Sequence, residues 1–182
     1  MRSLHCVVAL SALVATASLA CETARTEAAG LRFTLPRAWT RVPTLAETRA
    51  AQYRLPSAPG DVAETDFAVF FQGEGKGGSA AEHLGRWYAR FTQRDGRPSQ
   101  EAAVVTTRTV GDLRVTAIDL SGTWIGASAQ PSGAGVSGYR MLGAVVEGPG
   151  GPWVLEILGP AATVERAKPD FEVLLGSLEA HR

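Results

Sequence analysis

The sequence predicts an α+β fold: a single antiparallel sheet of about six or seven strands flanked by two main helices, in the order βββ-α-ββββ-α. Two observations predict this class. Strand-like runs follow one another through connections too short to join parallel neighbours, which need crossovers of about a dozen residues. Two segments with helical periodicity, one in the middle of the chain and one at its end, supply the helices. At 182 residues, 45% of them hydrophobic and 20% charged, the chain is long enough for one such domain.

Three strands are predicted before the first helix, at residues 31–35, 49–55 and 66–72. Apolar and polar residues alternate along the first strand until Pro36 ends it. In the third strand Phe67, Val69 and Phe71 occupy alternate positions, so they share one face of the sheet. This pattern is typical of a strand with one face against the core.

The hydrophobic period changes to a helical one after the third strand. Ser79 and Glu82 match a capping box, in which each side chain satisfies a backbone amide that the first helical turn leaves free. We expect the helix to run to about Arg94, because a turn-forming segment follows at residues 95–98. Trp87 lies on its apolar face and is predicted to enter the core, as are Trp124 and Trp153.

Four further strands are predicted at residues 102–110, 113–124, 139–147 and 153–159. The first two are separated only by Gly111 and Asp112, which is typical of a hairpin. Residues 126–138 form a long loop, either a contact surface or an unstructured connection. Residues 164–178 form a terminal amphipathic helix, bent or restarted at Pro169.

The N-terminal segment has the layout of an export signal. Arg2 supplies a positive charge, and residues 6–19 are apolar or small, a stretch too short to span a bilayer as a stable helix. The segment that ends in Cys21 resembles the lipobox of bacterial lipoproteins, although Ser18 stands where that motif usually has leucine. We predict a signal peptide over residues 1–20 and, from the resemblance, a lipidated cysteine directly after it.

The lipobox resemblance implies a lipid-anchored mature chain. Residues 21–30 would hold the lipidated Cys21 and a short polar tether, and residues 31–182 would form one globular domain. Glu22 is not the aspartate that typically retains such lipoproteins in the inner membrane, so the resemblance places the domain at the periplasmic side of the outer membrane. The alternative is ordinary secretion, in which the chain is soluble, in the periplasm or outside the cell, and Cys21 stays a free thiol.

Several runs of the mature chain resemble a family of uncharacterised exported bacterial proteins. They are the glycine-rich segment 73–79 with Arg86, Trp87 and Phe91 after it, the strand 138–148, and the terminal runs 159–160 and 171–178. The element order, with the opening strand followed by Pro36 and Trp39, is similar to the PsbP-like α/β/α sandwich. This resemblance implies an accessory or binding protein, and no catalytic residue carries over from it.

Composition excludes several classes of function. The 18 basic and 18 acidic side chains balance, so no global field attracts nucleic acid. After removal of the signal peptide two histidines remain, His83 and His181, which are too few and too far apart in the sequence to form a zinc site with Cys21. We therefore expect no metal and no nucleic-acid partner.

A glycine-rich segment lies between the third predicted strand and the first helix. Gly73, Gly75 and Gly78 satisfy GxGxxG, but the parallel βαβ unit of a dinucleotide site and its acidic residue are not predicted. We expect instead a tight connection with positive φ at several positions, and no cofactor. A further alternative is that Lys76 and the helix N-terminus bind a small anion.

Two groups of surface residues are candidates for contact with a ligand or partner. Arg86, Arg90 and Arg94 recur every four residues and would form a basic stripe along the first helix, able to rest on anionic lipid headgroups. The alternative is a solvated face whose arginines pair with acids on neighbouring strands. Tyr139 and Arg140, at the exit of the long loop, form the second group.

The predicted function is a lipid-anchored, non-enzymatic accessory or binding protein, whose partners are the membrane and either an envelope protein or a small ligand. One alternative is an envelope hydrolase that uses an acid, Glu156 or Asp119, together with His83. The other is a peripheral domain that binds anionic lipid or a small anion. No catalytic constellation is found in the sequence.

Overall fold

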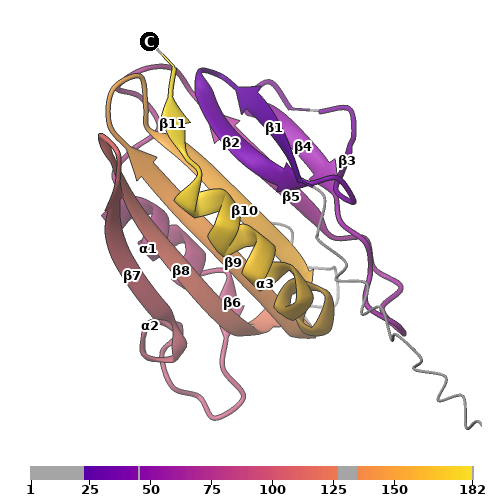
Figure 1. The fold of residues 1–182 in the computed structure, drawn as a ribbon. Helices are drawn as coiled ribbons and strands as arrows, with labels where there is room; N and C mark the ends of the chain where they lie inside the picture. Colours follow the sequence, from indigo (N-terminus) through magenta and orange to yellow (C-terminus); the bar gives the residue numbers. More distant parts are fainter. Residues whose placement is uncertain (1–22, 45, 127–134, 182) are drawn as a thin grey trace, which may run out of the picture.

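A computed structural model of the chain describes residues 23–44, 46–126 and 135–181. Its centre is an eight-stranded antiparallel sheet with the strand order β3-β4-β5-β10-β9-β8-β6, in which β7 also pairs with β8. One face of this sheet is covered by helix α3 and a three-stranded sheet, β1-β2-β11, and the other face by helix α1 (Figure 1). The fold is therefore α+β with antiparallel sheets, as the short connections predict.

The strands of the central sheet are β3 (Thr40–Arg41), β4 (Arg49–Arg54), β5 (Asp66–Phe71), β6 (Phe91–Thr92), β7 (Val104–Val110), β8 (Leu113–Trp124), β9 (Val136–Glu147) and β10 (Trp153–Pro160). The second sheet consists of β1 (Thr23–Ala28), β2 (Leu31–Pro36) and β11 (Glu179–Ala180). The helices are α1 (Ala80–Tyr88), α2 (Ser99–Ala102) and α3 (Ala161–Gly176). The seven predicted strands are all present, and Gly111 and Asp112 form the hairpin between β7 and β8.

The prediction of a single sheet with two helices is wrong, because β2 does not join the central sheet. It pairs with β1 on one side and β11 on the other, and both partners are polar or very short, so their sequences carry little strand signal. The apolar side chains of β2 point instead at the central sheet, where the Phe33 ring meets the Phe67 ring edge to face at 5.9 Å. The third helix, α2, is a single turn before β7.

The predicted tether over residues 21–30 also differs from the structure, because residues 23–28 of it form β1. Ala28 is buried in the core, and the Thr26 hydroxyl lies 3.2 Å from the Tyr53 hydroxyl of β4. Backbone pairing with all six residues of β2 orders a segment whose side chains are mostly polar. Cys21 lies outside the described residues.

The two predicted helices also differ in detail from the structure. Helix α1 ends at Tyr88, six residues before Arg94, because Phe91 turns into the core and pairs with Trp124 as part of β6. Helix α3 runs through Pro169 without a restart. Pro169 lies on the exposed side of α3, so solvent can hydrate the carbonyl that the proline leaves without a donor.

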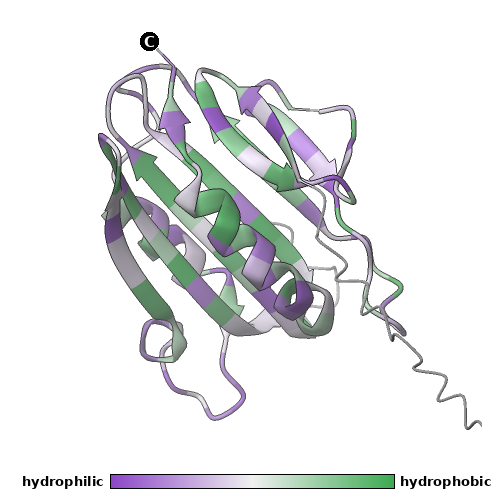
Figure 2. Cartoon of the chain, in the orientation of Figure 1, coloured by the Kyte–Doolittle hydropathy of each residue, from purple (hydrophilic) through white to green (hydrophobic). Residues whose placement is uncertain are grey.

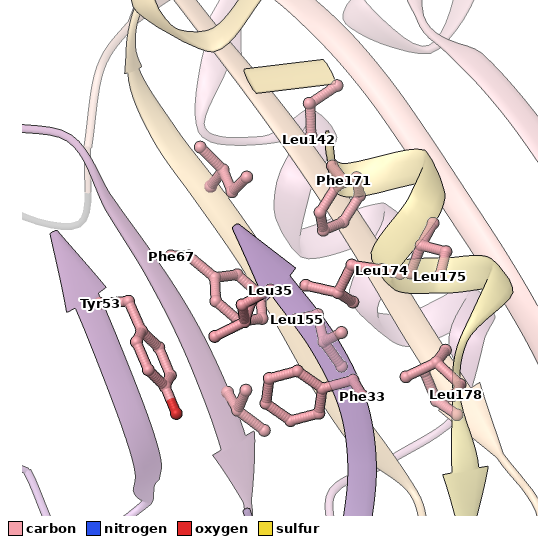
Figure 3. Packing of buried hydrophobic residues seen from close by; sticks show 14 of the residues in the cluster. Phe33, Leu35, Tyr53, Phe67, Leu142, Leu155, Phe171, Leu174, Leu175 and Leu178 are labelled. Atoms are coloured by element: carbon pink, nitrogen blue, oxygen red, sulfur yellow. The ribbon is translucent and has the colours of Figure 1, made fainter. Parts of the chain in front are cut away.

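The larger core lies between α3, β2 and the central sheet. Phe67 of β5 is at its centre, with the rings of Phe33, Tyr53 and Phe171 at centroid distances of 5.9 to 6.4 Å. Figure 3 shows these rings and the leucines of α3 pointing into one interior. In Figure 2 the central strands beneath α3 carry mostly hydrophobic residues, whereas β1 is largely hydrophilic.

A second, smaller core lies on the opposite face, beneath α1. Its buried members are Trp87, Phe91, Ile118, Leu120, Met141, Val145 and Val154. Helix α1 has only nine residues and is too short to cover the whole face. The ends of β5 and β10 beside it remain accessible, and the candidate site lies there.

Candidate functional site

A cavity of about 770 Å³ lies between α1 and the central sheet, on the face opposite α3. Its floor comes from side chains of β5 and β10 that point toward α1, among them Phe70, Val154 and Glu156. Its charged groups are Arg49, Glu82, Arg86, Arg90 and Glu156, and His83 lies beside them. A cavity of this size with an apolar floor and few charged groups has the general character of a site for a small organic ligand.

The glycine-rich connection from β5 to α1 forms one rim of the cavity. Gly73, Gly75, Gly77 and Gly78 all have positive φ, between 69° and 108°, as the prediction of a tight connection requires. The Gly75 amide donates to the carbonyl of Gly151, 2.8 Å away, which fixes the connection to the hairpin before β10. All strand pairs among the described residues are antiparallel, so the βαβ unit of a dinucleotide site is absent from them.

The capping box at the start of α1 is formed as predicted. The Ser79 amide donates to Glu82 Oε2 at 2.7 Å, and the Glu82 amide donates to Ser79 Oγ at 3.3 Å. The hydrogen bond from the Ser79 backbone is the main reason why the pKa of Glu82 lies below its usual value. Glu82 therefore contributes a negative charge at the cavity rim, with its Oε2 already used to cap the helix.

Glu156 lies on the cavity floor and is held by two donors. Trp87 Nε1 donates to its Oε1 at 2.7 Å, and Arg90 Nη1 lies 3.3 Å from Oε1 and 3.2 Å from Oε2. The Glu156 side chain is 15% exposed and that of Arg90 28%. Among the described residues Arg90 Nε is buried and has no hydrogen-bond partner, so Glu156 satisfies only part of this guanidinium.

His83 is buried beside the same floor. Its ring lies 5.8 Å from the ring of Trp87, and Nε2 donates to the carbonyl of Gly77 at 2.6 Å. Burial is the main cause that lowers the pKa of His83, so the imidazole is neutral at pH 7. With Nε2 as the donor, Nδ1 is the nitrogen that remains able to accept a hydrogen bond.

Two further arginines reach the cavity, and the charge of one of them, Arg86, helps to lower the pKa of Glu82, four residues before it on α1. Arg49 donates from Nη1 to Gln52 Oε1 at 2.7 Å, and its guanidinium lies 5.3 Å from the centroid of the Phe70 ring. Arg86 projects from the last turn of α1. Within the described part of the chain, neither Arg49 nor Arg86 forms an ion pair. Three arginines against two glutamates leave the cavity with a formal charge of +1.

The structure brings together only part of the predicted contact residues. Arg86 on α1 and Arg90, just past its end, line the cavity, but Arg94 lies further beyond the helix and lines a different hollow. The predicted stripe is therefore shortened to two arginines, because the helix ends early. Lys76 is exposed in the glycine-rich connection and does not line the cavity. Tyr139 lies beside the hollow of Arg94, with its ring stacked on Trp124 at 5.7 Å.

Arg140 lies on the other face of the sheet, where it pairs with Asp119. Its Nε and Nη2 donate to the two Asp119 oxygens at 2.7 and 2.6 Å, and Lys168 of α3 donates at 2.8 Å. Burial opposes ionisation of Asp119, but these donors outweigh it and lower its pKa. Asp119 faces α3, whereas His83 lies on α1, so the two residues do not converge. Residues 127–134 of the predicted contact loop lie outside the described residues.

Sequence reasoning missed Arg49 and Phe70 as cavity residues. Phe70 follows from the alternation in β5, because Phe67, Val69 and Phe71 on one face place Phe70 on the other. Arg49 has no comparable signal, because its position depends on the pairing of β4 with β5.

The described residues include no helix with the length and apolar character needed to cross a bilayer. They also contain no group of three or more histidine, cysteine or acidic side chains arranged to hold a metal ion.

No protein-family model matches the chain, and no curated protein is similar to it in sequence. Among solved structures it is similar to the solution structure of cyanobacterial PsbP (CyanoP) from Synechocystis sp. PCC 6803. The TM-score is 0.55 and the identity 12%, over 94% of this chain and 99% of that chain. The similarity shows a PsbP-like fold.

Proposed function

We propose that this chain with a PsbP-like fold is an exported, lipid-anchored accessory protein that binds a small ligand in the cavity beside α1 and catalyses no reaction. The observation that carries the proposal is the cavity itself, in which neither Arg49 nor Arg86 forms an ion pair within the described structure, while Glu82 and Glu156 already accept hydrogen bonds from the protein. Groups that are held in place and partly unsatisfied are suited to recognition.

The chemistry of the lining supports binding more than catalysis. The described residues that line the cavity include no serine, threonine or cysteine to act as a nucleophile. Glu156 accepts hydrogen bonds from Trp87 at Oε1 and from Arg90 at both oxygens, so its carboxylate is already held by the protein. His83 uses Nε2 to hold the glycine-rich connection.

Anchoring through Cys21 at the periplasmic face of the outer membrane remains part of the proposal. It rests on the lipobox resemblance, and the position of β1 is compatible with it. This strand begins at Thr23, so a lipid on Cys21 would be attached next to the folded domain and hold it close to the membrane surface.

Ligand binding is tested by a chemically diverse fragment screen on the purified full chain, read by two-dimensional ¹H–¹⁵N NMR. The proposal predicts fragments that shift the amides of His83, Trp87 and Glu156 together, because these residues share the cavity. Fragments that shift only the hollow beside Tyr139 would place the site elsewhere, and a screen without any hit contradicts the proposal.

Anchoring is tested by metabolic labelling with a palmitate analogue, with Cys21→Ser as the matched variant. Label should enter the wild-type chain and be absent from the variant. Unlabelled wild-type protein refutes the lipid anchor and favours a soluble periplasmic or secreted chain.

An envelope hydrolase is the second candidate, favoured by the fact that His83 and Glu156 line the same cavity. It predicts turnover of an ester or amide in a substrate panel, abolished in both His83→Gln and Glu156→Gln. Turnover that persists in both variants, or a panel without turnover, excludes this assignment.

A further inference from the structure

We propose that the ligand is an amphipathic organic anion: one carboxylate, sulfonate or phosphate ester group on an aromatic or short aliphatic body. This inference rests on the proposed function and names the ligand class of the same cavity. It follows from two properties of the lining, the surplus of guanidinium groups and the apolar floor.

The charge requirement comes from the arginines. Arg49 reaches the cavity from β4 and Arg86 from α1, so two different elements present a positive group to the same space. A guanidinium offers parallel N–H donors that match a carboxylate or phosphate, and such charge-assisted hydrogen bonds are stronger than neutral ones. His83 is neutral, so the positive charge of the cavity comes from the arginines.

The two carboxylates of the cavity do not cancel this attraction. Glu82 accepts from the Ser79 backbone and side chain, and Glu156 from Trp87 and Arg90. Among the described residues neither forms an ion pair with Arg49, which donates to a neutral amide oxygen, and the charge of Arg86 acts on Glu82 without a salt bridge between them. An anion between α1 and β4 could form ion pairs with Arg49 and Arg86, which form none within the described structure.

The apolar requirement comes from the floor and one wall. Phe70, Phe71, Trp87, Pro152 and Val154 contribute them, and the volume of about 770 Å³ far exceeds that of an inorganic anion. Phosphate alone would leave the apolar floor and wall exposed to water. A neutral hydrophobic molecule would bury the guanidinium groups without giving them a hydrogen-bond acceptor. An anion with an apolar body satisfies both.

The same chemistry occurs in a free metabolite and in an anionic lipid, and the test separates the two sources. The probes are 4-phenylbutyrate, its neutral counterpart 4-phenylbutan-1-ol, inorganic phosphate, and vesicles with and without an anionic phospholipid. Titrations of the full chain are followed by calorimetry and by the amide of His83. We expect 4-phenylbutyrate to bind about tenfold more tightly than the alcohol or phosphate.

Two variants with the same loss of charge locate the binding. Arg86→Gln should weaken 4-phenylbutyrate binding by about tenfold, whereas Arg94→Gln, in the separate hollow, should change it by less than about twofold. Circular dichroism and thermal unfolding verify that each variant is folded. If Arg86→Gln does not fold, Arg49→Gln takes its place.

The outcomes distinguish failure of the anionic ligand class from failure of ligand binding in the cavity. Equal binding of the acid and the alcohol in the cavity, or equal weakening by the two variants, overturns the anionic ligand and leaves a binding cavity. Binding of anionic vesicles without binding of 4-phenylbutyrate overturns the soluble ligand in favour of a lipid headgroup. A fragment screen without any cavity hit removes the proposed function as well.

Discussion

The substitution Glu156→Gln tests whether the charge on the cavity floor holds α1 in place. Glutamine keeps an oxygen for the Trp87 donor, 2.7 Å away, but turns an amide group toward Arg90 in place of a charged acceptor. A hydrogen bond to a charged group is worth about 1.5 to 3 kcal/mol. The Arg90 contacts are long, 3.2 and 3.3 Å, and water can reach part of its side chain. We therefore expect the free energy of unfolding to fall by about 1 to 2 kcal/mol.

The assay is urea unfolding of the full chain, supported by the melting temperature, which should fall by about 2 to 8 °C for this loss in a chain of this length. Glu172→Gln is the matched control, because Glu172 pairs with Arg108 on the surface, where the side chains are 49% and 41% exposed. That change should cost about 0.5 kcal/mol or less. Equal losses in the two variants would refute the reasoning, as would an Arg90→Gln double-mutant cycle without measurable coupling to Glu156.

Further predictions concern the helix cap, the main core and the charge of the cavity. Ser79→Ala should lower the free energy of unfolding by about 1 kcal/mol in urea, because it removes the cap of α1. Phe171→Ala should cost about 3 to 5 kcal/mol in the same assay, whereas Val173→Ala, exposed on the same helix, should cost about 0.5 kcal/mol or less. Because the pKa of His83 is lowered in the folded state, the unfolded chain takes up a proton at a higher pH than the folded chain does. The contribution of His83 to stability is therefore present above about pH 6.5 and declines on acidification. Between pH 7.5 and pH 5.5 the free energy of unfolding should therefore fall less for His83→Gln than for the wild type. Equal falls in the two proteins contradict this assignment. Glu156→Gln should tighten 4-phenylbutyrate binding in calorimetry, because it removes a negative charge from the cavity, and weaker binding in a folded variant would contradict the electrostatic argument.

Local patterns were sufficient to predict most of the elements. The alternation at residues 31–35 corresponds to β2, the Ser79 and Glu82 pair to the cap of α1, and Gly111 with Asp112 to a hairpin. Each signal depends on residues within a few positions of one another: burial of one face produces the alternation, local hydrogen bonds the cap, and a tight turn the hairpin. The same locality explains the error at the end of α1, because Phe91 is apolar whether it lies on the helix or, as in the structure, on β6.

The antiparallel class of the fold, the order of its long elements and most of its core residues were readable from the sequence, since these follow from hydrophobic period and connection length. The three-dimensional arrangement was needed to place β2 in a second sheet and to show that Arg49, Arg86 and Glu156 share one cavity while Asp119 lies on the other face. Strand partners and cavity walls come from segments far apart in the chain, and their meeting depends on pairing and packing that no short pattern encodes.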